Sequence, residues 1–307
     1  MAGKVNPTPW RTPSFWLKLA GGLLGLAGIV FVALRLIEYQ DELSQHALPA
    51  SFWAVLAFLS VVYGLSNSLL AIGWASLLRS RKAVVETNRV ISIYATSQLG
   101  KYIPGNIFQF AGRHALGLAA GLPNGALAAS AALELVFLAL GGLALSLTAG
   151  QHLLPAWPGF WFVVAAAALT AIIAIAVGRF AGRSATTAFA SYFAFLAVSG
   201  ICFAAVFVSL TGGMPSAAGL AYLAGAYVLA WLLGLVTPGA PAGLGIRETV
   251  LTVLLAGMAP ASIIILAVLA SRLVTVAGDI LFFAAGQATG MTSMRRHGGL
   301  ENRAPRS

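Results

Sequence analysis

The sequence predicts an all-α polytopic membrane protein, with six transmembrane helices and two re-entrant broken-helix hairpins in an inverted-topology repeat. Three observations lead to this prediction: an apolar composition, basic residues confined to some of the loops, and a Pro-Gly motif that occurs twice. Of the 307 residues, 59% are hydrophobic and 8% are charged, whereas an ordinary soluble domain has about 25% charged residues. No soluble core could bury so large an apolar excess.

Apolar segments that are long enough to cross a bilayer, about 20 helical residues each, follow one another along most of the chain. Six of them are predicted crossings: 15–37, 51–78, 126–149, 160–178, 189–210 and 262–289. The first is too long for a signal-peptide core and lacks a small-residue cleavage site, so we expect it to remain as an anchor. The prediction is one transmembrane domain, 1–290, with halves of about 1–149 and 150–290, followed by a basic cytoplasmic tail, 291–307.

The distribution of charge predicts the orientation of these crossings. Lys and Arg residues cluster before the first crossing, at 79–89, at 179–183 and at 295–306, and short basic loops mark the cytoplasmic side. The segment 38–46 instead carries three carboxylates, and 150–159 and 211–216 contain no Lys or Arg. We therefore expect both termini on the cytoplasmic side of the inner membrane. The net charge of +10 is then a topology signal, and no nucleic-acid partner is expected.

Two further apolar stretches, 91–121 and 217–257, must each begin and end on one side for these charges to agree. The two stretches share one motif: Leu-Gly, three residues, Pro-Gly, seven residues and Arg. In the first stretch it is Leu99-Gly100, Pro104-Gly105 and Arg113, and in the second it is Leu233-Gly234, Pro238-Gly239 and Arg247. Unwound backbone at membrane depth survives only when it is buried in protein or lines a wet cavity. Each stretch is therefore predicted to be a re-entrant hairpin.

Three predicted crossings separate the two hairpins, so the first would enter from the cytoplasm and the second from outside. Broken helices at matching positions of inverted halves indicate a transporter's binding site near the midplane. In the alternative, 217–236 crosses the bilayer completely and the second Pro-Gly loop emerges at the surface.

Ionisable residues within such apolar stretches are candidates for function. There are seven: Lys101, Arg113, Glu134, Arg247, Glu248, Arg272 and Asp279. The broken loops add residues whose free N–H groups or small size suit a bound anion: Pro104, Gly105, Asn106, Pro238, Gly239, Gly243 and Gly245. Together these residues predict a site for a phosphate-like group. In the alternative the charges neutralise one another, Arg113 with Glu134 and Arg272 with Asp279.

No enzyme motif accompanies these charges. The sequence has no nucleotide-binding P-loop, no HExxH, no GxSxG and no aspartate cluster that would hold magnesium. Its single cysteine, Cys202, excludes an intrachain disulfide. We therefore predict no catalytic residues, no metal and no cofactor.

At its two motifs the chain resembles the transmembrane, flippase-like domain of lysylphosphatidylglycerol synthases and the stand-alone relatives of that domain. The similar segments are 100–106 with Arg113, 237–248, and Arg272 in the downstream helix. The resemblance covers nearly the whole chain and implies a lipid-handling membrane domain. The second motif of that family commonly reads Pro-Gly-Gly, whereas this chain has Pro238-Gly239-Ala240. Since no aminoacyl transferase domain follows, no aminoacyl-transfer activity is expected.

The leading hypothesis is a flippase-like transporter that binds an anionic phospho- or glycolipid head group and moves the lipid across the inner membrane. One alternative is a membrane-embedded enzyme acting on a lipid-linked substrate, with Glu38, Asp41 or Glu42 as its base. Another is an accessory subunit that binds a partner enzyme of a lipid-modifying or glycosyl-transfer pathway, or forms a homo-oligomer.

Overall fold

The computed structural model describes residues 48–83, 86–102, 107–152, 154, 156–237 and 245–301, with side chains up to residue 288. Within these residues there is no β-strand. Five helices are long and apolar enough to cross a membrane: Ala50–Ser80, Asn124–Gln151, Gly159–Thr211, Ala217–Val236 and Ala261–Ala288. The chain thus has the helices of a multi-pass membrane protein.

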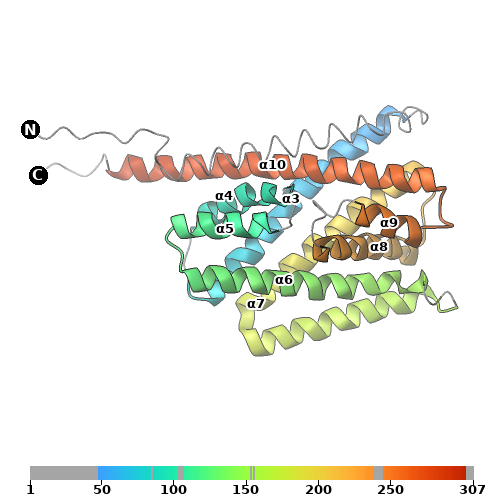
Figure 1. Cartoon of the computed structure of the whole chain (residues 1–307), viewed down its shortest axis with the longest axis horizontal. Coiled ribbons are helices and arrows are strands. Elements are labelled where there is room, and N and C mark those ends of the chain that lie inside the picture. Colours follow the sequence, from blue (N-terminus) through green and yellow to red (C-terminus); the bar gives the residue numbers. More distant parts are fainter. Residues whose placement is uncertain are drawn as a thin grey trace, which may run out of the picture.

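The helices lie in a single bundle (Figure 1). In chain order they are α3 (Ala50–Ser80), α4 (Thr87–Gln98), η2 (Leu99–Tyr102), α5 (Phe108–Ala119), α6 (Asn124–Ser146), η3 (Leu147–His152), α7 (Gly159–Thr211), α8 (Ala217–Val236), α9 (Ile246–Leu254) and α10 (Ala261–Glu301). Helix covers all five predicted crossings that fall within the described residues, and the predicted crossing 15–37 lies outside them. Helix α10 also continues into the predicted tail, because no proline interrupts 261–301.

Helix α7 turns back on itself at Gly182, whose φ of 80° and ψ of 178° are not helical. Glycine adopts this positive φ without the steric penalty that a Cβ atom brings. The turn falls between the two predicted crossings 160–178 and 189–210, and Arg179 and Arg183 beside it are exposed. Figure 1 shows the second part of α7 returning diagonally across the bundle toward the end where α7 begins. The 53-residue helix therefore supplies two long segments.

The two Pro-Gly stretches both form a helix, a break and a second helix. Helices α4 and α5 have 12 residues each, about 18 Å at 1.5 Å per residue, which is too short for a hydrocarbon core of about 30 Å. Helix α8 has 20 residues and would just reach across, while α9 has nine. By length alone, the complete crossing of 217–236 and the second hairpin therefore both remain compatible with α8.

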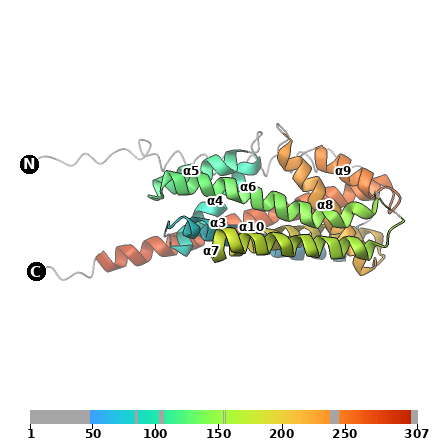
Figure 2. The same cartoon turned by 90° about the horizontal axis from the view of Figure 1, so that it is seen from below.

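The pairs α4–α5 and α8–α9 occupy opposite ends of the bundle (Figure 1). After a 90° turn, α5 and α9 lie on the same face of the bundle, again toward opposite ends (Figure 2). Helices α3, α6, α7 and α10 run past both pairs.

Small residues allow a close contact between α3 and α10. A Cβ atom added to Gly278 would lie 2.8 Å from the backbone N of Gly64 and 2.8 Å from the carbonyl oxygen of Ser60. Helices in membranes commonly approach each other at such small residues, since the hydrophobic effect does not drive apolar helices together in lipid. The outer surface is correspondingly apolar, with Phe180 90% and Leu65 68% exposed.

Candidate functional site

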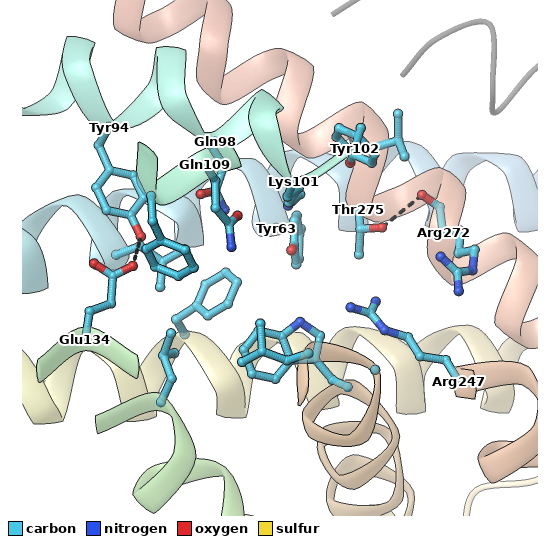
Figure 3. A pocket seen from close by; sticks show the side chains of 18 residues that line it. Tyr63, Tyr94, Gln98, Lys101, Tyr102, Gln109, Glu134, Arg247, Arg272 and Thr275 are labelled. Carbon is cyan, nitrogen blue, oxygen red and sulfur yellow. Dashed lines mark hydrogen bonds between the residues drawn. The ribbon is translucent and has the colours of Figure 1, made fainter. Parts of the chain in front are cut away.

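A cavity with polar and apolar lining lies in the interior, beside the helix ends of η2, α5, α8 and α9. Its volume of about 90 Å³ suits a few water molecules or one compact polar group. The residues that line it come from both broken pairs and from the long helices: Tyr63, Leu70, Tyr94, Gln98, Lys101, Tyr102, Gln109, Phe110, Glu134, Leu138, Phe195, Trp231, Gly234, Leu235, Arg247, Arg272, Thr275 and Val276 (Figure 3). Four of the predicted site residues are among them: Lys101, Glu134, Arg247 and Arg272.

Lys101, at the end of the first broken pair, is held by α10. Its Nζ lies 2.6 Å from Oδ2 of Asp279, a carboxylate with a fully buried side chain. Tyr102 donates its hydroxyl to the same oxygen at 2.5 Å, and Asn67 of α3 donates Nδ2 to Oδ1 at 3.0 Å. The three donors compensate this buried charge. Asp279 therefore joins η2, α3 and α10 at one wall of the cavity.

Arg113 forms a second buried network with Glu134, a residue that lines the cavity. Its Nη2 lies 2.9 Å from Oε1 of Glu134. The hydroxyl of Tyr94 donates to the same Oε1 at 2.9 Å, and the hydroxyl of Tyr192 donates to Oε2 at 3.2 Å. The guanidinium stacks over the ring of Tyr94, 4.0 Å from its centroid, and the Phe110 ring lies 5.3 Å away. The cation is thus enclosed by aromatic rings and one carboxylate, an arrangement that holds α4, α5, α6 and α7 together.

Arg272 pairs with Glu248 across the other end of the cavity, where Nε and Oε1 are 2.7 Å apart. Both side chains are part-exposed, at 15% and 21%. The predicted alternative of an Arg272–Asp279 pair is therefore wrong, whereas the predicted Arg113–Glu134 pair is present. Two turns of α10 separate Arg272 from Asp279, and each has a nearer partner on another helix.

Arg247 differs from the other cations of the site. Among the described residues no carboxylate lies within 4.0 Å of its guanidinium, and its buried Nε has no hydrogen-bond partner. Figure 3 shows its guanidinium pointing into the cavity, below Thr275. A buried guanidinium N–H without a hydrogen-bond partner is costly. The other three cations each have a carboxylate, so Arg247 gives the cavity its positive charge.

The matching arginines of the two motifs occupy different environments. Arg113 is the sixth residue of α5, and Arg247 is the second residue of α9. The first helix resumes soon after its break, whereas the second resumes only after Gly245, which has a φ of 79°. The equal sequence spacing therefore does not give equal geometry. The remaining predicted loop residues lie outside the described residues: Pro104, Gly105, Asn106, Pro238, Gly239 and Gly243.

Several residues that complete the site were not among the predicted ones. Asn67, Tyr102 and Tyr192 donate hydrogen bonds to the buried carboxylates, and Tyr63 and Trp231 line the cavity. Asn67 could have been predicted as a site residue, because an amide side chain within the apolar run 51–78 needs a polar partner. The tyrosines carried little signal, since their rings are equally common in apolar packing.

The fold and the cavity define a class: an all-helical multi-pass membrane protein with buried ion pairs around an internal polar cavity. Comparison with models of known families and with curated proteins finds no match for the chain. Its function must therefore be argued from the site.

Proposed function

We propose that this protein is a flippase-like lipid transporter of the inner membrane, which binds an anionic lipid head group in the cavity between its two broken helix pairs. The observation that carries the proposal is Arg247, a guanidinium that points into the cavity without a carboxylate partner among the described residues. An anion in the cavity would supply the missing partner. Ionisable residues at this depth in membrane proteins commonly serve substrate pathways.

The chemistry of a guanidinium favours a phosphate or similar oxyanion as that partner. Its planar fork donates two parallel hydrogen bonds to two oxygens of one group, which an ammonium cannot do. Thr275 and the hydroxyl of Tyr63 line the same cavity and add uncharged hydrogen-bonding groups. These polar groups surround the position toward which Arg247 points.

A lipid fits this cavity better than a whole soluble metabolite does. The volume of about 90 Å³ admits only a compact head group, so acyl chains would have to remain outside the bundle. An apolar groove between α3 and α10 offers them a path: it is lined by Trp53, Leu56, Leu273 and Ile280 and shares Val276 with the cavity. Head group and tail would then lie on two sides of α10.

The positions of the broken pairs support alternating access. The pairs α4–α5 and α8–α9 approach the cavity from opposite ends of the bundle, as the proposed inverted repeat requires. In transporters with inverted repeats, one half rocks against the other around a fixed central site. We propose the same for this chain, with both termini cytoplasmic, in agreement with the resemblance of its two motifs to the flippase-like family.

Reconstitution of the full chain into liposomes tests the proposal. Vesicles of phosphatidylcholine and phosphatidylglycerol would carry a trace of fluorescent phosphatidylglycerol, and a membrane-impermeant quencher would report its movement between leaflets. We expect the chain to accelerate movement without chemical change of the lipid, and Arg247→Gln to abolish that acceleration. Arg183→Gln, which alters an exposed arginine at the α7 turn, is the matched control.

The other outcomes would overturn the proposal in distinguishable ways. A new lipid product in mass spectra would support the enzyme. If the lipid neither moves nor changes chemically, the accessory role is favoured. Movement that is equally fast in Arg247→Gln would exclude this cavity as the pathway.

A further inference from the structure

Two glutamine side chains of the cavity take no part in its ion pairs. Gln98 is the last residue of α4 and Gln109 is the second residue of α5, and both line the cavity (Figure 3). Gln98 is 6% exposed, yet neither side-chain amide has a hydrogen-bond partner within the described part of the chain. Since buried polar groups are normally hydrogen-bonded, these amides indicate a polar partner that the chain itself does not supply.

The local fold brings the two glutamines to the same wall of the cavity. Helix α4 continues into η2, where Gly100 packs directly against the start of α5. A Cβ atom added to Gly100 would lie 2.8 Å from the backbone N of Gln109, so only glycine permits this approach. Gln98 and Gln109 therefore come from two adjacent segments, one on each side of the first break.

The chemistry of an amide favours hydroxyl groups as the missing partner. Each amide offers two N–H donors and a carbonyl acceptor, and a hydroxyl is likewise both a donor and an acceptor. The rings of Tyr63, Phe195 and Trp231 line the same cavity. Aromatic rings of this kind cover the carbon atoms of a ligand while a few polar groups fix its orientation. Two adjacent amides beside aromatic rings therefore suit a small polyol.

The charge of the cavity argues against an ammonium group at this position. Glu134 is the carboxylate among the described lining residues, and its oxygens already accept three hydrogen bonds. Arg247 adds a positive charge with no carboxylate within 4.0 Å in the described part of the chain. A further cation would enter without a counterion, at a substantial desolvation cost. An uncharged hydroxylated group avoids this cost.

We infer that the cavity recognises a small polyol, such as glycerol, esterified to the phosphate of the lipid, and that Gln98 and Gln109 bind its hydroxyl groups. The inference rests on the proposed function, because it takes the phosphate to be bound at Arg247. It goes further by assigning the part of the head group beyond the phosphate and the residues that recognise it. The cavity volume of about 90 Å³ limits that part to a small group.

Two short-chain lipids test this inference on the purified full chain in detergent. Dihexanoyl phosphatidylglycerol and dihexanoyl phosphatidylmethanol have the same acyl chains and the same charge, and only the first has free hydroxyl groups. We expect calorimetric titration to show that the wild-type chain binds phosphatidylglycerol about tenfold more tightly, because its hydroxyls add hydrogen bonds. The double variant Gln98→Met, Gln109→Met should bring the ratio of the two affinities close to one by weakening phosphatidylglycerol alone.

Gln287→Met is the matched control. The amide of Gln287 on α10 donates to Thr96 at 2.8 Å, and Gln287 is not among the residues that line the cavity, so the ratio should keep its wild-type value. Thermal unfolding of the double variant should match the wild type, because neither amide loses a partner in the described chain. Dihexanoyl phosphatidylethanolamine, which carries an ammonium, should bind about tenfold more weakly than phosphatidylglycerol.

The outcomes separate this inference from the proposed function. If both anionic lipids bind equally in a manner that Arg247→Gln abolishes, or if the double variant leaves their ratio unchanged, the polyol site is refuted and the phosphate site stands. If Arg247→Gln weakens neither lipid, or if neither binds, both fail. Equally tight binding of glycerophosphoglycerol, which lacks acyl chains, would assign the polyol to a soluble ligand and overturn a lipid as its source. Equally tight binding of phosphatidylethanolamine would refute the preference for an uncharged group.

Discussion

Arg113 and Glu134, 21 residues apart in the chain, form an ion pair of 2.9 Å in which both side chains are almost completely buried. Glu134 lines the cavity whereas Arg113 is not among its lining residues, and Tyr94, Tyr192 and Phe110 surround the pair. Its position indicates a structural role for Arg113, in contrast to the cavity-facing Arg247.

The first prediction concerns this pair. Arg113→Ala should strongly lower the amount of folded protein, because removing one partner of a buried pair leaves the other uncompensated at a cost of about 3–5 kcal/mol. Adding Glu134→Gln should restore much of the loss. Fluorescence-detected size exclusion of the solubilised chain with a thermal ramp measures both. Arg183→Ala should have no effect, since Arg183 is exposed. Failure of Glu134→Gln to rescue would contradict the structural role.

The second prediction is that Arg247 behaves in the opposite way. Arg247→Gln should leave thermal stability near or above that of the wild type, because no carboxylate loses its partner. Binding of dihexanoyl phosphatidylglycerol should nevertheless be lost. Arg247→Lys should bind it with intermediate affinity, since an ammonium cannot form the bidentate contact. Loss of folded protein in Arg247→Gln would instead indicate a structural partner.

The third prediction concerns the attachment of the first break to α10. Asp279→Asn should loosen η2, because Lys101 and Tyr102 both bind Oδ2 of this carboxylate. Hydrogen exchange of peptides covering 99–102 should become faster, while exchange in α6 remains unchanged. The double variant Lys101→Met, Asp279→Asn should recover part of the stability. Unchanged exchange in 99–102 would show that the ion pair does not hold this segment.

The fourth prediction concerns the contact of α3 with α10. Gly278→Val places a side chain 2.8 Å from backbone atoms of α3, so the helices must separate, and stability should fall by more than about 1 kcal/mol. Gly112→Val is the matched control, because no atom lies within 4 Å of its added Cβ. The control should change stability by less than about 1 kcal/mol. Equal effects of the two substitutions would argue against close packing here.

The fifth prediction concerns orientation. In a Cys202→Ala background, a cysteine at Ser216, the exposed N-cap of α8, should react with an impermeant maleimide added to intact cells. Cysteines at Ser80, the last residue of α3, and at Ser184, two residues after the α7 turn at Gly182, should react only after permeabilisation. Labelling of Ser80→Cys in intact cells would reverse the proposed topology and invalidate the assignment of a cytoplasmic side to the first broken pair.

The fold was largely predictable because its signals are local. A crossing is a run of apolar residues, so the positions of α3, α6, both parts of α7, and α10 could be predicted from composition along the chain. The turn at Gly182 falls at the predicted basic interruption between two such runs. Whether α8 crosses completely depends on how deeply it lies in the bilayer, which its 20-residue length does not decide.

The candidate site was predictable only in part. Charges are rare in apolar runs, and this rarity identified the ionisable residues at the site. The predicted alternative in which Glu134 neutralises Arg113 is confirmed. Asp279 is reached by Lys101 and Tyr102 from a segment distant in sequence, which local patterns do not record. Arg272 pairs with Glu248, 24 residues away, because of how α9 packs against α10. The hydrogen-bonding tyrosines were missed because their rings are equally common in apolar packing.

The sequence by itself determined that this chain is apolar, helical and interrupted at two Pro-Gly motifs, because backbone breaks and apolar runs depend on neighbouring residues alone. Only the tertiary structure decided that Arg113 is neutralised by Glu134 while Arg247 faces the cavity without a carboxylate among the described residues. The two arginines have equal spacing from their motifs. Their roles differ because the charge balance of a buried side chain depends on which helices pack against it, and sequence spacing does not record that.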